Sequence, residues 1–216
     1  MRFISNRIEG VGEVFKVMNQ KIIKKAVLFF ILATSITILV TLITYMINPD
    51  LKSVAEMADD RLSDQLKEAT GIEKVWAFIV GNGFKVPLQM FVLALIPVQF
   101  LYLVNIISTS VMAAILFGVI FRLDDRNAFE VIIATMPHYI VEVFAFCLFG
   151  AVLFELNQAI RSKISNLFKK DKDRLSLVST VLNTMKIYGV LTLPLIILAA
   201  ILETYIADMI LSLIQK

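Results

Sequence analysis

Long apolar runs without charge dominate the pattern of this chain. The first, residues 26–47, has 22 residues and no charged side chain. At a rise of about 1.5 Å per residue it covers about 33 Å, which is the hydrocarbon thickness of a bilayer. The run therefore predicts a membrane-spanning helix. What precedes it is too long and polar for a signal peptide, and no small-residue cleavage pattern follows, so we expect an uncleaved signal anchor.

The second run, residues 86–121, is too long for one crossing. Its 36 residues carry no charge and would measure about 54 Å as one helix, so the run is expected to fold back on itself. Asn105 and the polar cluster at 108–110 mark its middle, while Pro87 and Pro97 interrupt its first half. We expect spans near 86–104 and 106–121, either as two full crossings or as a re-entrant pair of half-helices.

Two further runs, 131–154 and 187–212, are each long enough to span. The pattern thus predicts an all-α, polytopic helical membrane bundle with five hydrophobic segments. The second and third segments form a hairpin or re-entrant pair. We expect residues 1–216 to form one membrane domain.

Charge bias predicts the orientation of these segments. Residues 1–25 carry six Lys or Arg against two acids, 48–85 carry five against seven, and 155–186 carry seven against three. Lys and Arg are enriched on the cytoplasmic side of a membrane, so both 1–25 and 155–186 are expected there. With the middle run folded back, the amino terminus is cytoplasmic and the carboxyl terminus lies outside.

Segments outside the spans show amphipathic patterns. Residues 3–25 are typical of a basic interfacial helix, and 48–76 of an external amphipathic segment whose helical stripe covers 51–69. The cytoplasmic basic loop 155–186 combines apolar and cationic side chains, a pattern that suits anionic lipid headgroups.

Composition narrows the functional classes. The chain is 58% apolar and 18% charged, with a mean hydropathy of +0.81. A single cysteine, Cys147, excludes an internal disulfide framework or a cysteine zinc site. The net charge of +3 is distributed as membrane orientation requires, so nucleic acid is not expected as a partner.

Ionisable side chains inside the runs are the candidates for chemistry. His138 and Glu142 are four residues apart and share one helix face, and Glu203 is expected at a similar depth in the last span. We expect these three to form a buried polar cluster, joined by Asn105 or Asn82. The cluster either stabilises helix packing through hydrogen bonds or acts as a proton or ion relay. No motif for a metal, a cofactor or a catalytic site is found.

Small residues recur at four-residue spacing in the third segment, at Ser110, Ala114 and Gly118. This spacing lets another helix approach closely. Packing within the monomer is the simpler interpretation, and the seam of a homo-oligomer is the alternative.

Two segments carry a family resemblance. Residues 136–146, MPHYIVEVFAF, followed by Gly150, resemble the Pro-His-x-x-x-Glu-x-x-Ala pattern of the stage II sporulation protein M family. The last span, 193–208, is similar to its closing Ala-x-x-Glu-x-(Phe/Tyr) segment. Asn82 and Asn105 match recurrent asparagines of the family, whereas Pro97 and Ile106 stand where it commonly has glycine.

The resemblance implies a five-span protein of the bacterial plasma membrane with no known catalytic activity and no cofactor. Founding members resemble a scaffold that holds peptidoglycan-degrading partners at the engulfing septum membrane, and others accompany maturation or export of circular bacteriocins. We therefore expect a non-enzymatic scaffold or accessory protein that binds membrane or envelope proteins. The alternative is a transporter or channel component that uses His138, Glu142 and Glu203.

Overall fold

The structure is a computed structural model that describes residues 20–47, 49–50, 70–123, 125–168 and 176–214. The predicted interfacial helix at 3–25 lies largely outside these residues, and the stripe at 51–69 lies wholly outside them. The described elements are α2 (Gln20–Ile47), α5 (Ile72–Phe78), η1 (Ile79–Lys85), α6 (Val86–Leu95), η2 (Leu101–Leu103), α7 (Val104–Leu123), α8 (Asp125–Phe168), α9 (Leu177–Ile187), η3 (Tyr188–Thr192), α10 (Leu193–Ile201), η4 (Leu202–Ile206) and α11 (Ala207–Ile214).

All of these elements are helical, and five helices are long and apolar enough to cross a membrane: 20–47, 72–95, 101–122, 128–166 and 177–214. The prediction of an all-α bundle with five hydrophobic segments is confirmed. We number these helices as spans one to five.

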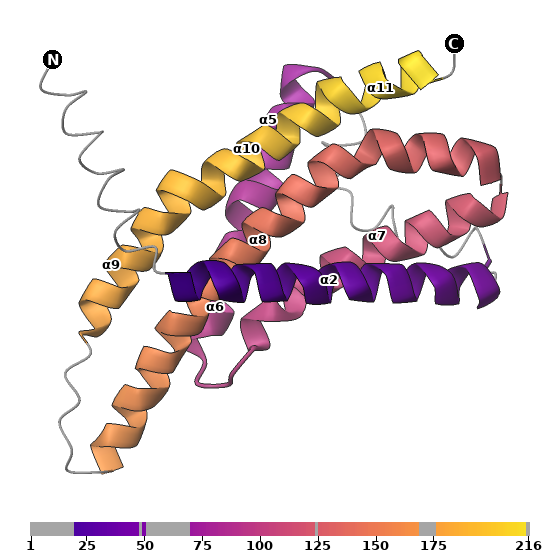
Figure 1. Ribbon diagram of the computed structural model, residues 1–216. Coiled ribbons are helices and arrows are strands. Elements are labelled where there is room, and N and C mark those ends of the chain that lie inside the picture. The colour runs from indigo at the N-terminus through magenta and orange to yellow at the C-terminus, as the bar shows by residue number, and fades with distance from the viewer. Residues whose placement is uncertain (1–19, 48, 51–69, 124, 169–175, 215–216) are drawn as a thin grey trace, which may run out of the picture.

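The fourth span is the centre of the bundle. In its most apolar stretch 72% of the residues are buried, against 22–28% in each of the other spans. Helices from all four other spans pack against α8, which lies between α2 and the line of α9, α10 and α11 (Figure 1). The outer spans thus present most of their surface to lipid, whereas α8 is enclosed by protein.

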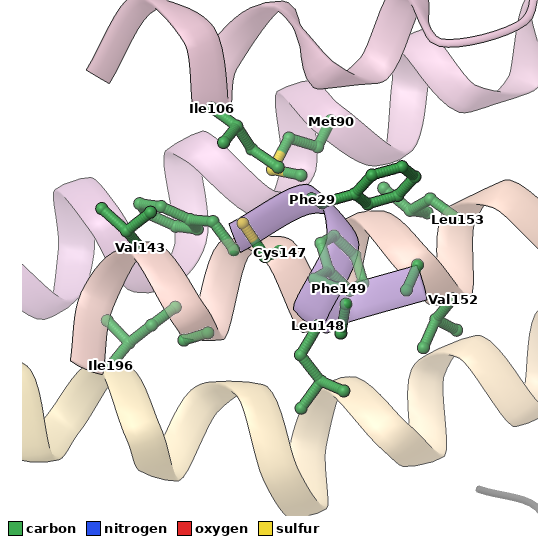
Figure 2. Close-up of a cluster of buried hydrophobic side chains, with 14 of the residues drawn as sticks. Phe29, Met90, Ile106, Val143, Cys147, Leu148, Phe149, Val152, Leu153 and Ile196 are labelled. Atoms are coloured by element: carbon green, nitrogen blue, oxygen red, sulfur yellow. The ribbon is translucent and has the colours of Figure 1, made fainter. Parts of the chain in front are cut away.

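The core joins all five spans. Phe29 of the first, Met90 of the second, Ile106 of the third and Ile196 of the fifth converge on a row of α8 side chains around Cys147 (Figure 2). Because lipid tails are as apolar as these side chains, close van der Waals contact, rather than removal from water, holds them together.

The hairpin between the second and third spans turns at residues 96–100, not at Asn105 as predicted. The spans therefore cover 72–95 and 101–122 instead of 86–104 and 106–121, and each is long enough for a full crossing. Asn105 lies in the first turn of α7, where its carbonyl accepts a hydrogen bond from Thr109 Oγ1 at 3.0 Å. Hydroxyls bonded in this way continue a membrane helix rather than break it.

One side chain of α8 holds this turn. The Nδ2 of Asn157 lies 2.9 Å from the carbonyl oxygen of Ala94 and 2.7 Å from that of Ile96. Its Oδ1 accepts a bond from Arg161 Nε at 3.0 Å. Phe100 closes the turn at φ 67°, a conformation that is uncommon without glycine. The carbonyls that the end of α6 leaves without intrahelical donors are thus satisfied by the central helix.

Polar pairs define two ends of the bundle. At one, Lys25 Nζ lies 3.1 Å from Glu155 Oε1, beside Asn157 and the turn 96–100; we call this the Lys25 end. At the other, which we call the Lys74 end, Lys74 pairs with Glu203, and α7 and α2 finish together with Arg122 over the Tyr45 ring. Successive spans therefore run in alternating directions.

The predicted basic loop 155–186 is mostly helical where it is described. Helix α8 continues to Phe168 and α9 begins at Leu177, with Ser176 Oγ accepting a bond from the Ser179 amide as its amino-terminal cap. The segment 155–186 is thus helical over its described residues 155–168 and 177–186, and its position on the cytoplasmic side stays a prediction.

Three π-helical segments interrupt the second and fifth spans. η1 and η3 each end just before an α-helix with proline in its first turn, at Pro87 and Pro194. Proline lacks an amide hydrogen and its ring clashes with the carbonyl four residues earlier. For Pro87 that carbonyl belongs to Gly83, and it accepts a hydrogen bond from the Tyr188 hydroxyl of η3 instead. The two interrupted spans are thus joined where they cross.

Candidate functional site

α8 presents His138 and Glu142 one helical turn apart, immediately after Pro137. Glu142 is only 7% exposed. The Nδ1 atom of His138 is buried and has no hydrogen-bond partner among the described residues. Two ionisable groups therefore lie inside the bundle on its most enclosed helix, where charged groups are costly.

The fifth span contributes Glu203, which lies in η4. Its Oε1 is 3.5 Å from Nζ of Lys74 on α5, and both side chains are partly buried, at 25% and 33% exposure. η4 packs on α8, while α5 packs on α10. The ion pair therefore ties the second span to the fifth beside the central helix.

These groups act on one another electrostatically. The carboxyl groups of Glu142 and Glu203 repel, and the Lys74 ammonium also repels positive charge on His138. If both carboxyl groups are ionised, their two negative charges exceed the single positive charge of Lys74 by one. The ion pair can hold the two spans together, and an excess acid can take up a proton or a cation; that His138, Glu142 and Glu203 form one cluster stays a prediction. Among the described residues, no group of three or more His, Cys, Asp or Glu is arranged to hold a metal ion.

Sequence reasoning missed Lys74. The residue was counted in the extramembrane stretch 48–85, because the second span was expected to begin at residue 86. The span begins at Ile72. The apolar run 75–80, which follows Lys74 directly, was the available signal that the helix starts earlier.

The two asparagines lie apart from these contacts. The Nδ2 of Asn105 is 3.4 Å from the Val86 carbonyl and 3.5 Å from Oε1 of Gln89, so it links the arms of the hairpin. Asn82 lies partly exposed in η1. Within the part of the chain that the structure describes, neither asparagine forms a hydrogen bond with His138, Glu142 or Glu203, so the expected role of Asn105 as a link to them is not seen.

The small residues of α7 pack against α2. Thr41 Oγ1 donates to the Ala114 carbonyl at 3.2 Å. A Cβ atom added to Gly118 would lie 2.6 Å from Thr44 Cβ, which real side chains do not allow. Ser110 is fully buried on the same face. The stripe is therefore used between two helices of one chain.

A three-helix polar contact lies on the same seam. The Thr37 hydroxyl of α2 donates to the Ala33 carbonyl at 3.0 Å and lies 2.6 Å from the Tyr139 hydroxyl of α8. A hydroxyl has one hydrogen, so Tyr139 is the donor to Thr37. The Ser110 carbonyl of α7 is 3.5 Å from the same Thr37 oxygen.

Two grooves open on the surface of the bundle. One, of about 440 Å³, runs between α2 and α10 with Phe144 and Leu148 of α8 among its lining residues. The other, of about 190 Å³, lies between α6 and α9 and contacts Phe149 and Tyr188. Their walls are almost wholly apolar, and neither is lined by His138, Glu142 or Glu203. These grooves suit lipid chains or apolar side chains rather than water.

Comparison with known proteins gives one match. A family model described as stage II sporulation protein M matches residues 26–208. The matched region begins within α2 and ends at Asp208 in α11, so it contains all five spans in whole or in part. No curated protein matches the chain, and no solved structure does.

Proposed function

Because this chain belongs to the stage II sporulation protein M family, which is not known as an enzyme family, we propose that it is a non-enzymatic integral membrane scaffold or accessory protein. In this role it binds other membrane or envelope proteins. It lies in the bacterial plasma membrane with the Lys25 end toward the cytoplasm, as the Lys and Arg excess in 1–25 and 155–186 favours.

The observation that carries the proposal is that the charged groups of the site are either paired with each other or enclosed by protein. A scaffold needs a firmly packed body and surfaces left for partners. Lys74 and Glu203 pair with each other, and Glu142 lies on the enclosed central helix. The four outer spans bury less than a third of their most apolar stretches. Large lipid-facing surfaces therefore remain for partner helices, for anionic lipid or for a second copy.

A transport component is the second candidate, and one specific observation favours it. The two spans that cross at Tyr188 and Gly83 are both interrupted by π-helical segments, and interrupted helices commonly form the binding sites of transporters. The excess carboxyl group in the cluster would then carry a proton or an ion.

Reconstitution separates the two candidates. The full chain is placed in liposomes that enclose a pH-sensitive dye, and proton, sodium and potassium gradients are imposed in turn. A scaffold predicts leak rates equal to those of protein-free liposomes. Flux above that level, lost in Glu142→Gln or Glu203→Gln while the protein still inserts, would favour transport.

Protein abundance in cells gives a second test. Glu203→Gln is expected to lower the amount of membrane-inserted protein, because it leaves Lys74 without its partner inside the bundle. Glu155→Gln is the matched control, since it removes a carboxylate from the more exposed pair with Lys25. Cross-linking from residues 51–69 with identification of the captured envelope proteins tests partner binding directly.

A further inference from the structure

The larger apolar groove lies between two spans that begin at the same end of the bundle. α2 bounds it on one side, η3 and α10 bound it on the other, and Phe144 and Leu148 of α8 line it between them. Figure 2 shows Leu148 directed from α8 toward the fifth span. Every side chain that lines the groove is apolar, so water and polar headgroups find no hydrogen-bond partner among these side chains.

The groove runs inward from the Lys25 end. Its outer part is lined by Ile23 and Ala26, which lie beside the lysine that pairs with Glu155. Its inner part is lined by Leu198 and by Phe144, and Phe144 lies about 16 Å before Glu155 along α8. This direction follows from contacts within the protein and does not depend on the position of the membrane.

Lysines lie at the outer end of the groove on both walls. Lys24 follows Ile23 directly, and Lys186 lies one helical turn before Val190. Both lysine side chains are exposed. Side chains on a helix lean toward its amino terminus, and both spans begin at the Lys25 end. The two ammonium groups therefore lean toward that end, away from the apolar interior of the groove.

Positive charge is in excess at this end of the groove. Lys21, Lys24, Lys25 and Lys186 carry four positive charges and Glu155 carries one negative charge, which leaves an excess of three. The other acids in the described part of the chain belong to the middle of the bundle or to the Lys74 end. On both walls the charge-free run begins directly after the last of these lysines. The protein surface thus changes from cationic to apolar at the mouth of the groove.

A phospholipid with an anionic headgroup matches this arrangement. An acyl chain suits the apolar walls, and a phosphate near the mouth meets the excess of positive charge. A cavity of about 150 Å³ holds one benzene molecule, so the groove, of about 440 Å³, has room for a long part of one acyl chain. Because the groove lies between membrane spans, lipid is also the molecule that surrounds its opening.

Other occupants match the charge less well. The segment 1–19 carries three Lys or Arg against two acids, so it adds positive charge rather than opposing it. Two copies of the chain inserted with the same orientation place their lysine-rich ends at the same level, where like charges repel. An anionic lipid is therefore the occupant that the charges favour.

We propose that the groove between α2 and α10 is a binding site for one anionic phospholipid. One acyl chain lies against Phe144, Leu148 and Leu198, and the phosphate lies near Lys24 and Lys186. This site goes beyond the scaffold function, because it needs no partner protein.

Native mass spectrometry of the full chain in detergent tests the site, with phosphatidylglycerol and phosphatidylcholine of identical acyl chains. One phosphatidylglycerol molecule should be retained about tenfold more tightly than phosphatidylcholine. The double change Lys24→Gln and Lys186→Gln should weaken phosphatidylglycerol binding about tenfold and leave phosphatidylcholine binding unchanged. Leu198→Trp should weaken the binding of both lipids, because the indole fills the inner part of the groove from a position that is 45% exposed.

Two matched variants serve as controls. Lys163→Gln removes an exposed lysine of α8 that lies about 12 Å beyond Glu155 along the helix, where its charge is largely screened at physiological ionic strength. Leu39→Trp adds an indole to the exposed face of α2, at a residue that does not line the groove. Both controls should bind the two lipids as the unmodified chain does. Equal helicity, measured by circular dichroism, shows that each variant is folded.

The position of the acyl chain is tested in the unmodified protein. A phosphatidylglycerol with a diazirine at the middle of one acyl chain is bound and irradiated, and the labelled residues are mapped by peptide mass spectrometry. Labels are expected in 144–148 and 190–198, which contain the lining residues of α8 and of the fifth span. Labelling of these residues should be weaker in Leu198→Trp than in Leu39→Trp.

Three results would overturn the proposal. The first is equal retention of phosphatidylglycerol and phosphatidylcholine by the unmodified chain, which would leave no role for the lysines. The second is labelling only outside the groove, as expected if residues 1–19 or a second copy occupies it. The third is a loss of phosphatidylglycerol in Lys163→Gln as large as in the double variant, which would assign binding to the general charge of this end. None of these measurements depends on a partner protein or on ion flux, so this inference can fail while the scaffold function stands.

Discussion

The two sides of α8 are built differently. On one side, α2 and α7 are uninterrupted helices that meet through small residues and hydroxyls, as at Gly118 and Thr41. On the other side, the second and fifth spans are interrupted by π-helical segments and meet through the Tyr188 hydroxyl and the pair of Lys74 with Glu203. We call these the regular side and the interrupted side.

The difference shows two uses of polar groups between membrane helices. On the regular side each helix satisfies its own backbone, so a bond such as that from Thr41 to the Ala114 carbonyl is an addition to close packing. On the interrupted side Pro87 deprives the Gly83 carbonyl of its donor, and the Tyr188 hydroxyl replaces what is missing. Polar contacts are therefore supplementary on one side and required on the other.

The largest loss of stability is expected at Asn157, where the turn of the interrupted second span is bonded to α8. Asn157→Leu should lower the free energy of unfolding by about 2–4 kcal/mol, because the Ala94 and Ile96 carbonyls each lose a donor. Unfolding by SDS titration in mixed micelles, followed by circular dichroism, measures the change. A loss below about 1 kcal/mol would show that water satisfies the turn without Asn157.

The regular side should be most sensitive to added volume. Gly118→Ala is expected to cost about 1–3 kcal/mol because its Cβ would overlap Thr44 and the Thr41 carbonyl. The matched change Gly81→Ala, on the interrupted second span, has open space around it and should not destabilise the protein. Equal losses in the two variants, measured by the same titration, would contradict close packing as the basis of this side.

Substitution of two tyrosines compares a supplementary hydrogen bond, that of Tyr139, with a required one, that of Tyr188. Tyr188→Phe should cost about 1–2 kcal/mol, since the Gly83 carbonyl then loses the hydroxyl that replaces the missing amide of Pro87. Tyr139→Phe should cost about 0.6 kcal/mol, the average for bonds between membrane helices. Pro87→Ala restores an amide donor to Gly83 and should therefore reduce the cost of Tyr188→Phe. If the double variant is as destabilised as the two single changes added together, Pro87 is not the reason for the bond.

The smallest contributions to stability are expected from the ion pairs. A double-mutant cycle with Lys74→Gln and Glu203→Gln should give a coupling of about 1 kcal/mol. The same cycle with Lys25→Gln and Glu155→Gln should give about 0.5 kcal/mol or less, because Glu155 is 42% exposed. The reverse order would mean that exposure does not decide the strength of these pairs.

Hydropathy alone predicted the fold class and the number of spans, because charge-free runs of the right length have few alternatives in a membrane. The ends of the second span were harder to predict. Lys74 and Lys85 were read as extramembrane because both are charged, yet one is paired with Glu203 and the other faces outward within the span. A charged residue therefore does not by itself mark the end of a membrane helix.

The prediction of where the hairpin turns failed for a related reason. The polarity of Asn105 and of the hydroxyl residues after it predicts a break, but Thr109 bonds to the Asn105 carbonyl within its own helix. Pro97 was the better signal, because it lies in the turn itself. Polarity in a membrane segment does not by itself indicate a turn.

The candidate site was only partly accessible to sequence reasoning. His138 and Glu142 follow from their spacing on one helix, and Glu203 from its place in an apolar run. The pairing of Glu203 with Lys74 depends on how two spans far apart in the sequence cross, and the π-helical segments that set this crossing have no reliable local signature. Whether the three residues act together stays a prediction.

The position of Asn157 also constrains how the protein is made. Ala94, whose carbonyl it holds, is synthesised 63 residues earlier, and chains emerge from the ribosome in order. The second and third spans are therefore synthesised before the amide that fastens their turn. The bonds from Asn157 to the Ala94 and Ile96 carbonyls can form only after the fourth span has been made.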